Sequence, residues 1–317
     1  MKEITIQEMK HVCVGQAEDE RAGTGCTVII CKEGAVAGVD VRGGGPATRE
    51  TDLLNPINMV QKIHAVCLSG GSAYGLDAAS GVMQYLEEHG IGFDMQVARI
   101  PIVCGASLFD LSVGDPNVRP DKAMGYQACV NSESGCFEEG NHGAGTGASV
   151  GKMLGFDHAM KSGIGTYGLE MDGVQVVAIV AVNACGNVVD FDTNEVLAGM
   201  LDKDTNTIIK AEDVLEQFRK AQPLGNTTIG CIITNAKLTK AQCTKVAGIS
   251  HNGYARSIHP VHTMSDGDTI FVLSTQEVDC DPDIIGVMAT NAMGKAINRA
   301  VYKAKGAYGL KAHCDLK

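Results

Sequence analysis

The sequence predicts a layered α/β protein in which stacked β-sheets are covered by helices. Short apolar runs rich in β-branched residues indicate buried strands, and they lie at residues 26–31, 35–41, 66–69, 174–182, 229–234 and 269–273. Apolar residues at helical spacing indicate amphipathic helices, and they lie at residues 70–89, 236–249 and 282–303. Strands and helices follow one another in both orders, so we expect helices to cover the outer faces of the sheets.

Composition is that of an ordinary globular protein. Hydrophobic residues make up 44% of the 317 residues and charged residues 20%, which is enough apolar material for a sizeable core. No linker or low-complexity tract divides the chain, so we expect a single domain over residues 1–317. The net charge of −11 repels phosphate groups, so nucleic acid and anionic membranes are poor partners. Without a signal-peptide pattern or a run of ~20 apolar residues, the expected location is cytoplasmic.

Cysteine and histidine give no sign of a metal centre. The chain has twelve cysteines, none in a C-x-x-C pair, and most lie within apolar runs. We interpret them as buried thiols in a reducing compartment, neither disulfides nor zinc ligands. His251, His259 and His262 show no recognised ligand spacing and are interpreted as ordinary polar residues. We therefore expect no metal and no cofactor.

The N-terminal third alternates strands with glycine turns. Residues 32–34 separate two apolar runs and predict a hairpin, and residues 42–54 form a polar, glycine-rich surface loop. The strand at 66–69 leads through a glycine turn into a helix that ends near His89, before Gly90. The spacing G-x-G-x-x-G is absent from this strand, turn and helix, which excludes a dinucleotide-binding motif.

A second glycine-rich loop, residues 143–153, is similar in composition to a phosphate-binding loop but lacks the residue spacing of that motif. Thr146 stands where the first glycine is required, and Met153 stands where Ser or Thr should follow the lysine. What remains is a flexible loop that carries Lys152.

The chain around Asn226 and Thr227 combines a connector with a strand. Residues 209–220 predict an exposed amphipathic helix, which residues 223–225 end, so that Thr227 emerges from a connector directly into a buried strand. The strand at 174–182 ends in Asn183, whose amide is costly to bury without partners.

Five of these stretches resemble the signatures of one peptidase family, which contains L-aminopeptidase D-amidase/esterases, β-peptidyl aminopeptidases and nylon-oligomer hydrolases. They are residues 49–54, 68–76, 145–148, 226–228 and 266–269, in the family's order. The resemblance runs from about residue 15 to 310. It implies an αββα sandwich of the N-terminal-nucleophile type, a homo-oligomer of four or more subunits, and small peptides or amides as substrates.

The resemblance also implies self-processing. In the family, a precursor cuts itself before a Ser or Thr that begins a strand, and that position resembles Thr227. Cleavage would give an α chain of residues 1–226 and a β chain of residues 227–317. Threonine is a weak nucleophile, and its freed α-amine, with a pKa of ~7.7–8.0, can serve as the neighbouring base. The expected enzyme is an aminopeptidase or amidase that works through an acyl-Thr227 intermediate.

Four other residues resemble the family's catalytic groups. Lys152 resembles a lysine whose ammonium lowers the pKa of the hydroxyl and attracts an oxyanion, and Asn183 resembles an oxyanion-hole residue. Asp266 and Asp268 resemble the carboxylates that orient the N-terminal amine and the hydroxyl. From the residues alone, Lys152 could equally be an ordinary loop lysine and Asn183 a cap at the end of its strand. The two aspartates could equally belong to a plain turn.

Three residues are weaker candidates. Tyr74 and Phe109 are expected in the substrate pocket, and Phe109 stands where some nylon-oligomer hydrolases carry a tyrosine aimed at the reacting carbonyl. Cys231 lies four residues after Thr227, hence on the same face of the strand, and is a rival nucleophile. Two rival functions also remain: an acyltransferase similar to ornithine acetyltransferases, and an uncleaved ligand-binding or assembly protein.

Overall fold

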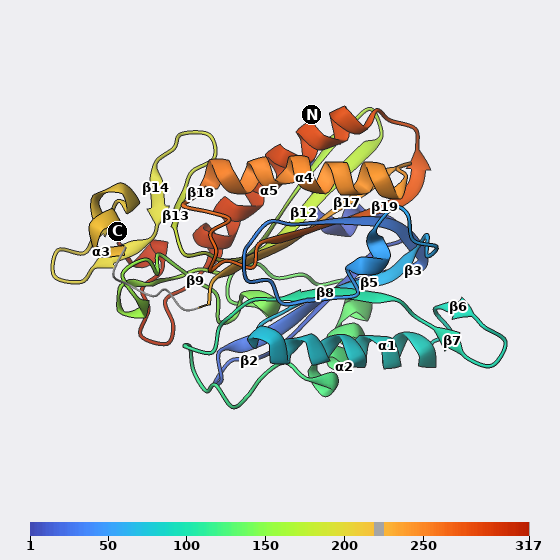
Figure 1. The fold of residues 1–317 in the computed structure, drawn as a ribbon, viewed down its shortest axis with the longest axis horizontal. Coiled ribbons are helices and arrows are strands. Elements are labelled where there is room, and N and C mark those ends of the chain that lie inside the picture. Colours follow the sequence, from blue (N-terminus) through green and yellow to red (C-terminus); the bar gives the residue numbers. More distant parts are fainter. Residues whose placement is uncertain (219–224, 317) are drawn as a thin grey trace.

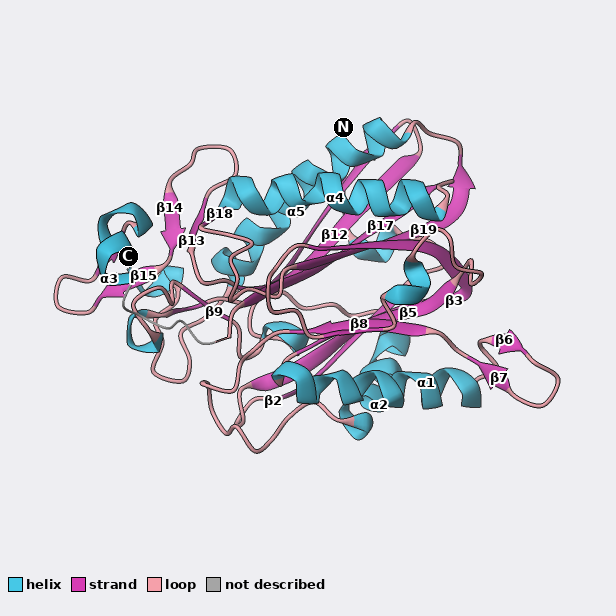
Figure 2. Ribbon diagram, in the orientation of Figure 1, coloured by secondary structure: helices cyan, strands magenta, loops and turns pink. Residues whose placement is uncertain are grey.

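A computed structural model describes residues 1–218 and 225–316, and its elements form four layers (Figures 1 and 2). Helices α4 (Lys240–Ser257) and α5 (Pro282–Lys303) cover one sheet, and α1 (Ala78–Glu88) and α2 (Lys122–Asn131) cover the other. The two sheets lie between these helix pairs, face to face. The predicted αββα sandwich is confirmed.

Both sheets are mostly antiparallel. The first has the order β1 (Lys2–Ile4), β11 (Ile164–Met171), β12 (Val174–Asn183), β17 (Thr227–Ala236), β19 (Thr269–Val278) and the second half of β3 (Thr24–Val41). The second contains β2 (Cys13–Asp19), the first half of β3, β5 (Ile63–Ser69), β8 (Val103–Ser107) and β4 (Thr48–Arg49). Among the described strands of these two sheets, β17 with β19 and β5 with β8 pair in parallel, and the other pairs are antiparallel.

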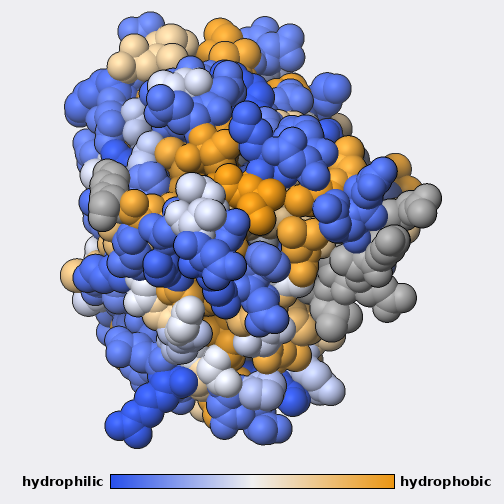
Figure 3. All heavy atoms as spheres, turned by 90° about the vertical axis from the view of Figure 1, so that its left-hand side faces the viewer, coloured by the Kyte–Doolittle hydropathy of each residue, from blue (hydrophilic) through white to orange (hydrophobic). Residues whose placement is uncertain are grey.

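Shorter elements extend the edges. They are β6 (Phe93–Asp94), β7 (Arg99–Ile100), β9 (Ser149–Val150), β10 (Met160–Lys161), β13 (Asn187–Val189), β14 (Val196–Ala198), β15 (Met200–Asp202), β16 (Thr207–Ile209), α3 (Leu215–Phe218) and β18 (Ile258–His259). The end of the molecule that carries α3 and β14 shows apolar side chains among polar ones (Figure 3). Among them, Leu215 is 59% and Val196 37% exposed. No helix in the described ranges is long and apolar enough to cross a membrane.

Strand β3 joins the two sheets. Its first half pairs with β2 and β5, and its second half pairs with β19. The predicted hairpin at residues 32–34 is therefore wrong. The chain stays extended there with a shift in register on β5, because each half finds its own partner strands while Lys32 and Glu33 face solvent.

Alternation along β12 fills two cores at once. Val176, Ala178 and Val180 pack toward the helices α4 and α5, whereas Val177 and Ile179 pack between the sheets. Residues of odd number on β17, such as Cys231, also lie between the sheets. By the same alternation, Asn183 and Thr227 lie at the end of this inter-sheet layer.

The predicted elements mostly match. The helix at 282–303 and the strand at 174–182 are confirmed, the former capped by Asp281. The helix predicted at 236–249 was placed too early, because β17 continues to Ala236 and Thr239 caps a helix that starts at Lys240. The helix predicted at 209–220 begins later than expected, since β16 occupies residue 209, a 3₁₀ turn follows and α3 starts at Leu215. Residues 219–224 lie outside the described residues.

Candidate active site

Thr227 is the first residue of β17, and its antiparallel partner on β12 is Asn183. Thr227 is 4% exposed and Asn183 is fully buried. Strand β19 lies on the other side of β17, and the turn before β19 carries Asp266 and Asp268. Sheet order thus brings three separate parts of the chain to the peptide bond between Asn226 and Thr227.

The carbonyl group of Asn226 is held by backbone and side chain. Its oxygen accepts a hydrogen bond of 3.1 Å from the N–H of Gly267, and the Thr227 hydroxyl contacts the same oxygen. The Asn226 N–H donates to the carbonyl of Ser265 over 3.3 Å. A polarised peptide carbonyl therefore lies beside the hydroxyl group of Thr227.

Two glycines make this approach possible. A Cβ on Gly267 would lie 2.7 Å from the Thr227 hydroxyl oxygen. Gly225 has a φ of +52°, and a Cβ there would lie 2.1 Å from the ring of Phe109. Larger residues at either position would displace the bond that precedes Thr227.

Lys152 contacts this centre through Asn183. Its Nζ donates to the Asn183 side-chain oxygen over 2.8 Å and to the Asn183 carbonyl over 3.1 Å. The Asn183 amide nitrogen donates in turn to the carbonyl of Phe109 over 2.8 Å. Burial lowers the pKa of Lys152 to about 7, although nearby Cys185, Asp266 and Asp110 oppose the shift. At neutral pH both the amine and the ammonium are therefore populated.

The two carboxylates have different partners. Asp268 accepts from the N–H of Thr228 over 2.8 Å, and its other oxygen accepts from the backbone N–H of His262 and contacts the His262 Nδ1, each over 2.9 Å. Asp266 accepts from the N–H and hydroxyl of Thr263 over 2.9 and 2.6 Å. Burial, and then the charge of Asp268, raise the pKa of Asp266.

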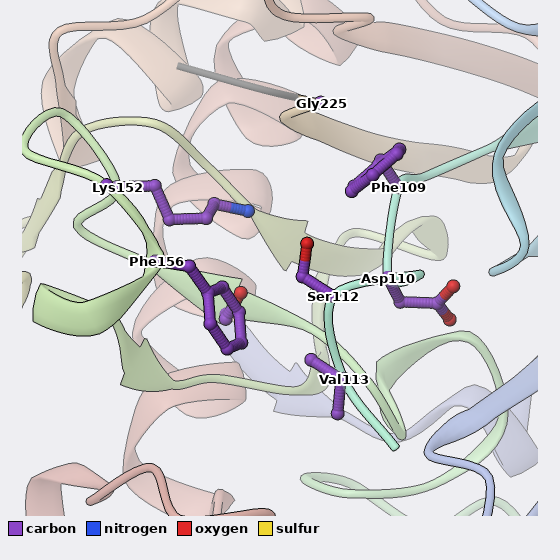
Figure 4. Close-up of a pocket in the computed structure, with 9 residues that line it drawn as sticks. Phe109, Asp110, Ser112, Val113, Lys152, Phe156 and Gly225 are labelled. Atoms are coloured by element: carbon purple, nitrogen blue, oxygen red, sulfur yellow. The ribbon is translucent and has the colours of Figure 1, made fainter. Parts of the chain in front are cut away.

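A pocket of about 110 Å³ adjoins Lys152 (Figure 4). The loop before Val113 forms one wall, and the loop after Lys152 forms the other. The lining residues are Phe109, Asp110, Ser112, Val113, Ser149, Lys152, Gly155, Phe156 and Gly225. Because Gly225 lies one residue before Asn226, the pocket lies on the side of the chain that precedes Thr227.

Sequence comparison identifies the family. The model of peptidase family S58 matches residues 5–314. The chain belongs to peptidase family S58. This membership makes the protein a hydrolase, of the aminopeptidase and amidase type to which its relatives belong.

Relatives and a solved structure agree with this membership. An uncharacterized aminopeptidase of Mycobacterium leprae is 39% identical, over 92% of this chain and 86% of the relative. A 6-aminohexanoate-oligomer endohydrolase of Paenarthrobacter ureafaciens is 35% identical, over 88% and 77%. The L-aminopeptidase D-Ala-esterase/amidase of Ochrobactrum anthropi, described as a variant of the Ntn hydrolase fold, superposes with a TM-score of 0.73 at 19% identity over 100% of this chain and 94% of that one. This last likeness shows that the S58 hydrolase has the Ntn fold.

Most of the residues predicted for the site of this S58 hydrolase lie together. Asn183 pairs with Thr227 and bonds Lys152, Asp268 bonds the residue after Thr227, and Asp266 forms an isolated bridge with Asn226. Phe109 lines the pocket. Tyr74 does not line it, because its ring is 62% exposed and stacks under Arg119.

Cys231 lies on the predicted face but within the inter-sheet core. It is fully buried, and desolvation raises the pKa of its thiol well above the usual value. A thiol without thiolate character is a poor nucleophile.

The sequence interpretation missed His262. We took it for an ordinary polar residue, yet its ring and backbone both contact Asp268, and its ring centroid lies 4.7 Å from that of His251. The only available signal was its place in the same turn as Asp266 and Asp268. Phe156 and Ser149 were also missed, because nothing in their local sequence indicates a pocket.

Proposed function

We propose that this S58 hydrolase is made as a precursor that cuts its own bond between Asn226 and Thr227, and then uses Thr227 to hydrolyse small peptides or amides. The observation that supports it best is the Asn226 carbonyl oxygen, which accepts the Gly267 N–H while the Thr227 hydroxyl lies beside it. A donor aimed at the oxygen that becomes negative stabilises the tetrahedral intermediate.

Self-cleavage begins with removal of the Thr227 hydroxyl proton. The uncharged amine of Lys152 accepts it, which a pKa of about 7 permits at neutral pH. The hydroxyl oxygen then bonds to the Asn226 carbonyl carbon, and the bond from that carbon to the Thr227 nitrogen breaks as the nitrogen takes up the proton. Water hydrolyses the resulting ester, which leaves a carboxylate on Asn226 and a free α-amine on Thr227.

The mature reaction repeats this chemistry on a substrate. The new α-amine of Thr227 takes the hydroxyl proton, and the oxygen attacks the substrate carbonyl to form an acyl-Thr227 ester while the amine product leaves. The Gly267 N–H and the second amide hydrogen of Asn183 donate to the oxyanion. Asp268 holds the strand end through the Thr228 N–H, and the backbone of Asp266 pairs with that of Asn226, next to the new α-amine. Water then releases the acid.

The named relatives support the proposed substrate class. They are named as aminopeptidases and as hydrolases of 6-aminohexanoate oligomers, so both peptide and amide bonds are within reach of this family. We propose that this chain removes the N-terminal residue from small peptides or amides.

Intact mass under denaturing conditions tests the proposal, with two isosteric variants. Thr227→Val removes the proposed nucleophile. Thr228→Val is a matched control, because the buried Thr228 hydroxyl has no hydrogen-bond partner among the described residues. We expect two fragments that meet at 226/227 in wild type and in Thr228→Val, and one chain in Thr227→Val. An uncut chain in all three would overturn the proposal that the protein cleaves itself.

Product analysis separates hydrolysis from acyl transfer. Wild type is incubated with an aminoacyl amide, with and without an added amine such as ornithine. We expect the free amino acid to dominate in both. If the acylated amine is the main product, the proposed function changes from hydrolysis to acyl transfer.

A further inference from the structure

We infer that the pocket beside Lys152 binds the side chain of the substrate residue that acylates Thr227, and that Phe156 limits this side chain to a short, uncharged, apolar group. The inference rests on the proposed function and names the substrate class of the same site.

The position of the pocket relates it to the acyl half of the substrate. Gly225 forms part of its wall and precedes Asn226, the residue whose carbonyl carbon meets Thr227. At the inner end, Lys152 and Ser149 both donate to the side-chain oxygen of Asn183. The pocket therefore adjoins the residue that precedes Asn226 and the two residues that bond Asn183, on the side of the scissile bond that stays bound to the enzyme.

The walls are suited to an apolar group. The rings of Phe109 and Phe156 and the side chain of Val113 face the space from the two loops that enclose it (Figure 4). The Asp110 carboxylate points away from it and is held by the Thr24 hydroxyl and the Gly71 N–H, each over 2.7 Å. Among the described residues that line the pocket, Lys152 is the cationic one, and it disfavours a positively charged side chain.

The volume limits the length of that group. A cavity of roughly 150 Å³ holds a benzene molecule, with six carbons. At the same volume per carbon, the 110 Å³ of this pocket accommodate about four carbons. A phenyl side chain exceeds this limit.

Phe156 is the wall that can be changed without disturbing the scissile bond. It begins a 3₁₀ turn, Phe156–His158, four residues after Lys152. Phe109, by contrast, accepts the Asn183 amide at its carbonyl, and its ring packs against Gly225. Removing the Phe156 ring enlarges the pocket while these contacts remain.

The test compares kcat/KM within each variant for L-aminoacyl p-nitroanilides with linear side chains of one to six carbons, and for the phenylalanyl and lysyl compounds. The variants are wild type, Phe156→Ala, Phe156→Leu and the control Phe93→Ala, whose ring lies on the β6–β7 hairpin at the other end of the molecule. Intact mass first shows that each protein has cleaved itself.

For wild type and Phe93→Ala we expect kcat/KM to rise roughly fourfold per methylene up to about four carbons and then to fall. The lysyl compound should have a low kcat/KM with both of these proteins. In Phe156→Ala the optimum moves to longer chains, and the ratio of phenylalanyl to alanyl hydrolysis rises by about tenfold or more.

If kcat/KM depends on side-chain length in the same way in self-cleaved Phe156→Ala as in wild type, the inference is wrong. The proposed hydrolase function would stand. If Phe156→Ala does not cleave, Phe156→Leu decides in the same way, since it keeps an apolar side chain in place. Uncut wild type, or hydrolysis that persists in Thr227→Val, would overturn the proposed function instead.

Discussion

Lys152 bonds both oxygen atoms of Asn183, the side-chain oxygen at 2.8 Å and the carbonyl oxygen at 3.1 Å. Asn183 is the cross-strand partner of Thr227, so a single residue connects the buried amine to the proposed nucleophile. The contact needs no charge on the lysine, because an uncharged amine also donates hydrogen bonds.

The pKa of Lys152 predicts how self-cleavage depends on pH. Burial lowers this pKa to about 7, so protonation below pH 7 removes the free amine, and the cleavage rate falls about tenfold for each further pH unit. The precursor has no free Thr227 amine, so that amine does not contribute to the pH dependence of self-cleavage. Precursor isolated at pH 5 and shifted to higher pH is followed by intact mass. Lys152→Met should stay uncut and the exposed-site control Lys237→Met should cleave. Rapid cleavage of wild type at pH 5 would contradict the role as base.

His262 is predicted to act through Asp268. Replacing it by Gln removes the imidazole contact to a buried carboxylate, and a hydrogen bond to a charged group contributes about 1.5–3 kcal/mol. If that energy orients Asp268, the rate of self-cleavage falls roughly 10- to 100-fold. His259→Gln is the control, because among the described residues the His259 ring hydrogen-bonds a helix carbonyl, that of Ala255, and not Asp266 or Asp268. A lower Tm with an unchanged rate would assign His262 a purely structural role.

Gly225 is predicted to resist any side chain. Gly225→Ala places a Cβ 2.1 Å from the Phe109 ring and forces alanine into a left-handed conformation that costs about 1–2 kcal/mol. Urea unfolding, carried out on the uncut Thr227→Val background, should show lower stability. Adding Phe109→Ala should restore the stability that is lost through the clash. The loss caused by the left-handed backbone conformation should remain. Full stability in Gly225→Ala would mean that the loop adopts another path.

Cys231 is predicted to be dispensable for chemistry. Its thiol is fully buried with a raised pKa, so Cys231→Ala should cleave and hydrolyse at the wild-type rate and lose about 1 kcal/mol of stability from the small cavity. Thermal unfolding and p-nitroanilide assays measure the two effects. Loss of both activities in a folded variant would restore the cysteine as a nucleophile candidate.

Local sequence patterns predicted much of the fold. The helix at 282–303 was placed with its observed bounds, because its apolar spacing and the proline near its start act within the segment itself. The break at residues 32–34 was interpreted as a hairpin, which is wrong. Glycine and charged residues are as typical of a bulge in a long strand as they are of a turn. The choice between a turn and a bulge depends on whether the two halves of the strand have partner strands in two different sheets.

The sequence by itself placed a buried strand directly after the connector, and its resemblance to the peptidase family made Thr227 the candidate nucleophile. Tertiary structure alone decided which side chains surround it. Asn183 is 44 positions away along the chain and meets Thr227 through strand pairing, and His262 and Phe156 reach the site from a turn and a loop. Strand propensity and side-chain alternation depend on neighbours in the chain, whereas these contacts depend on the order of strands in the sheet, which no local pattern encodes.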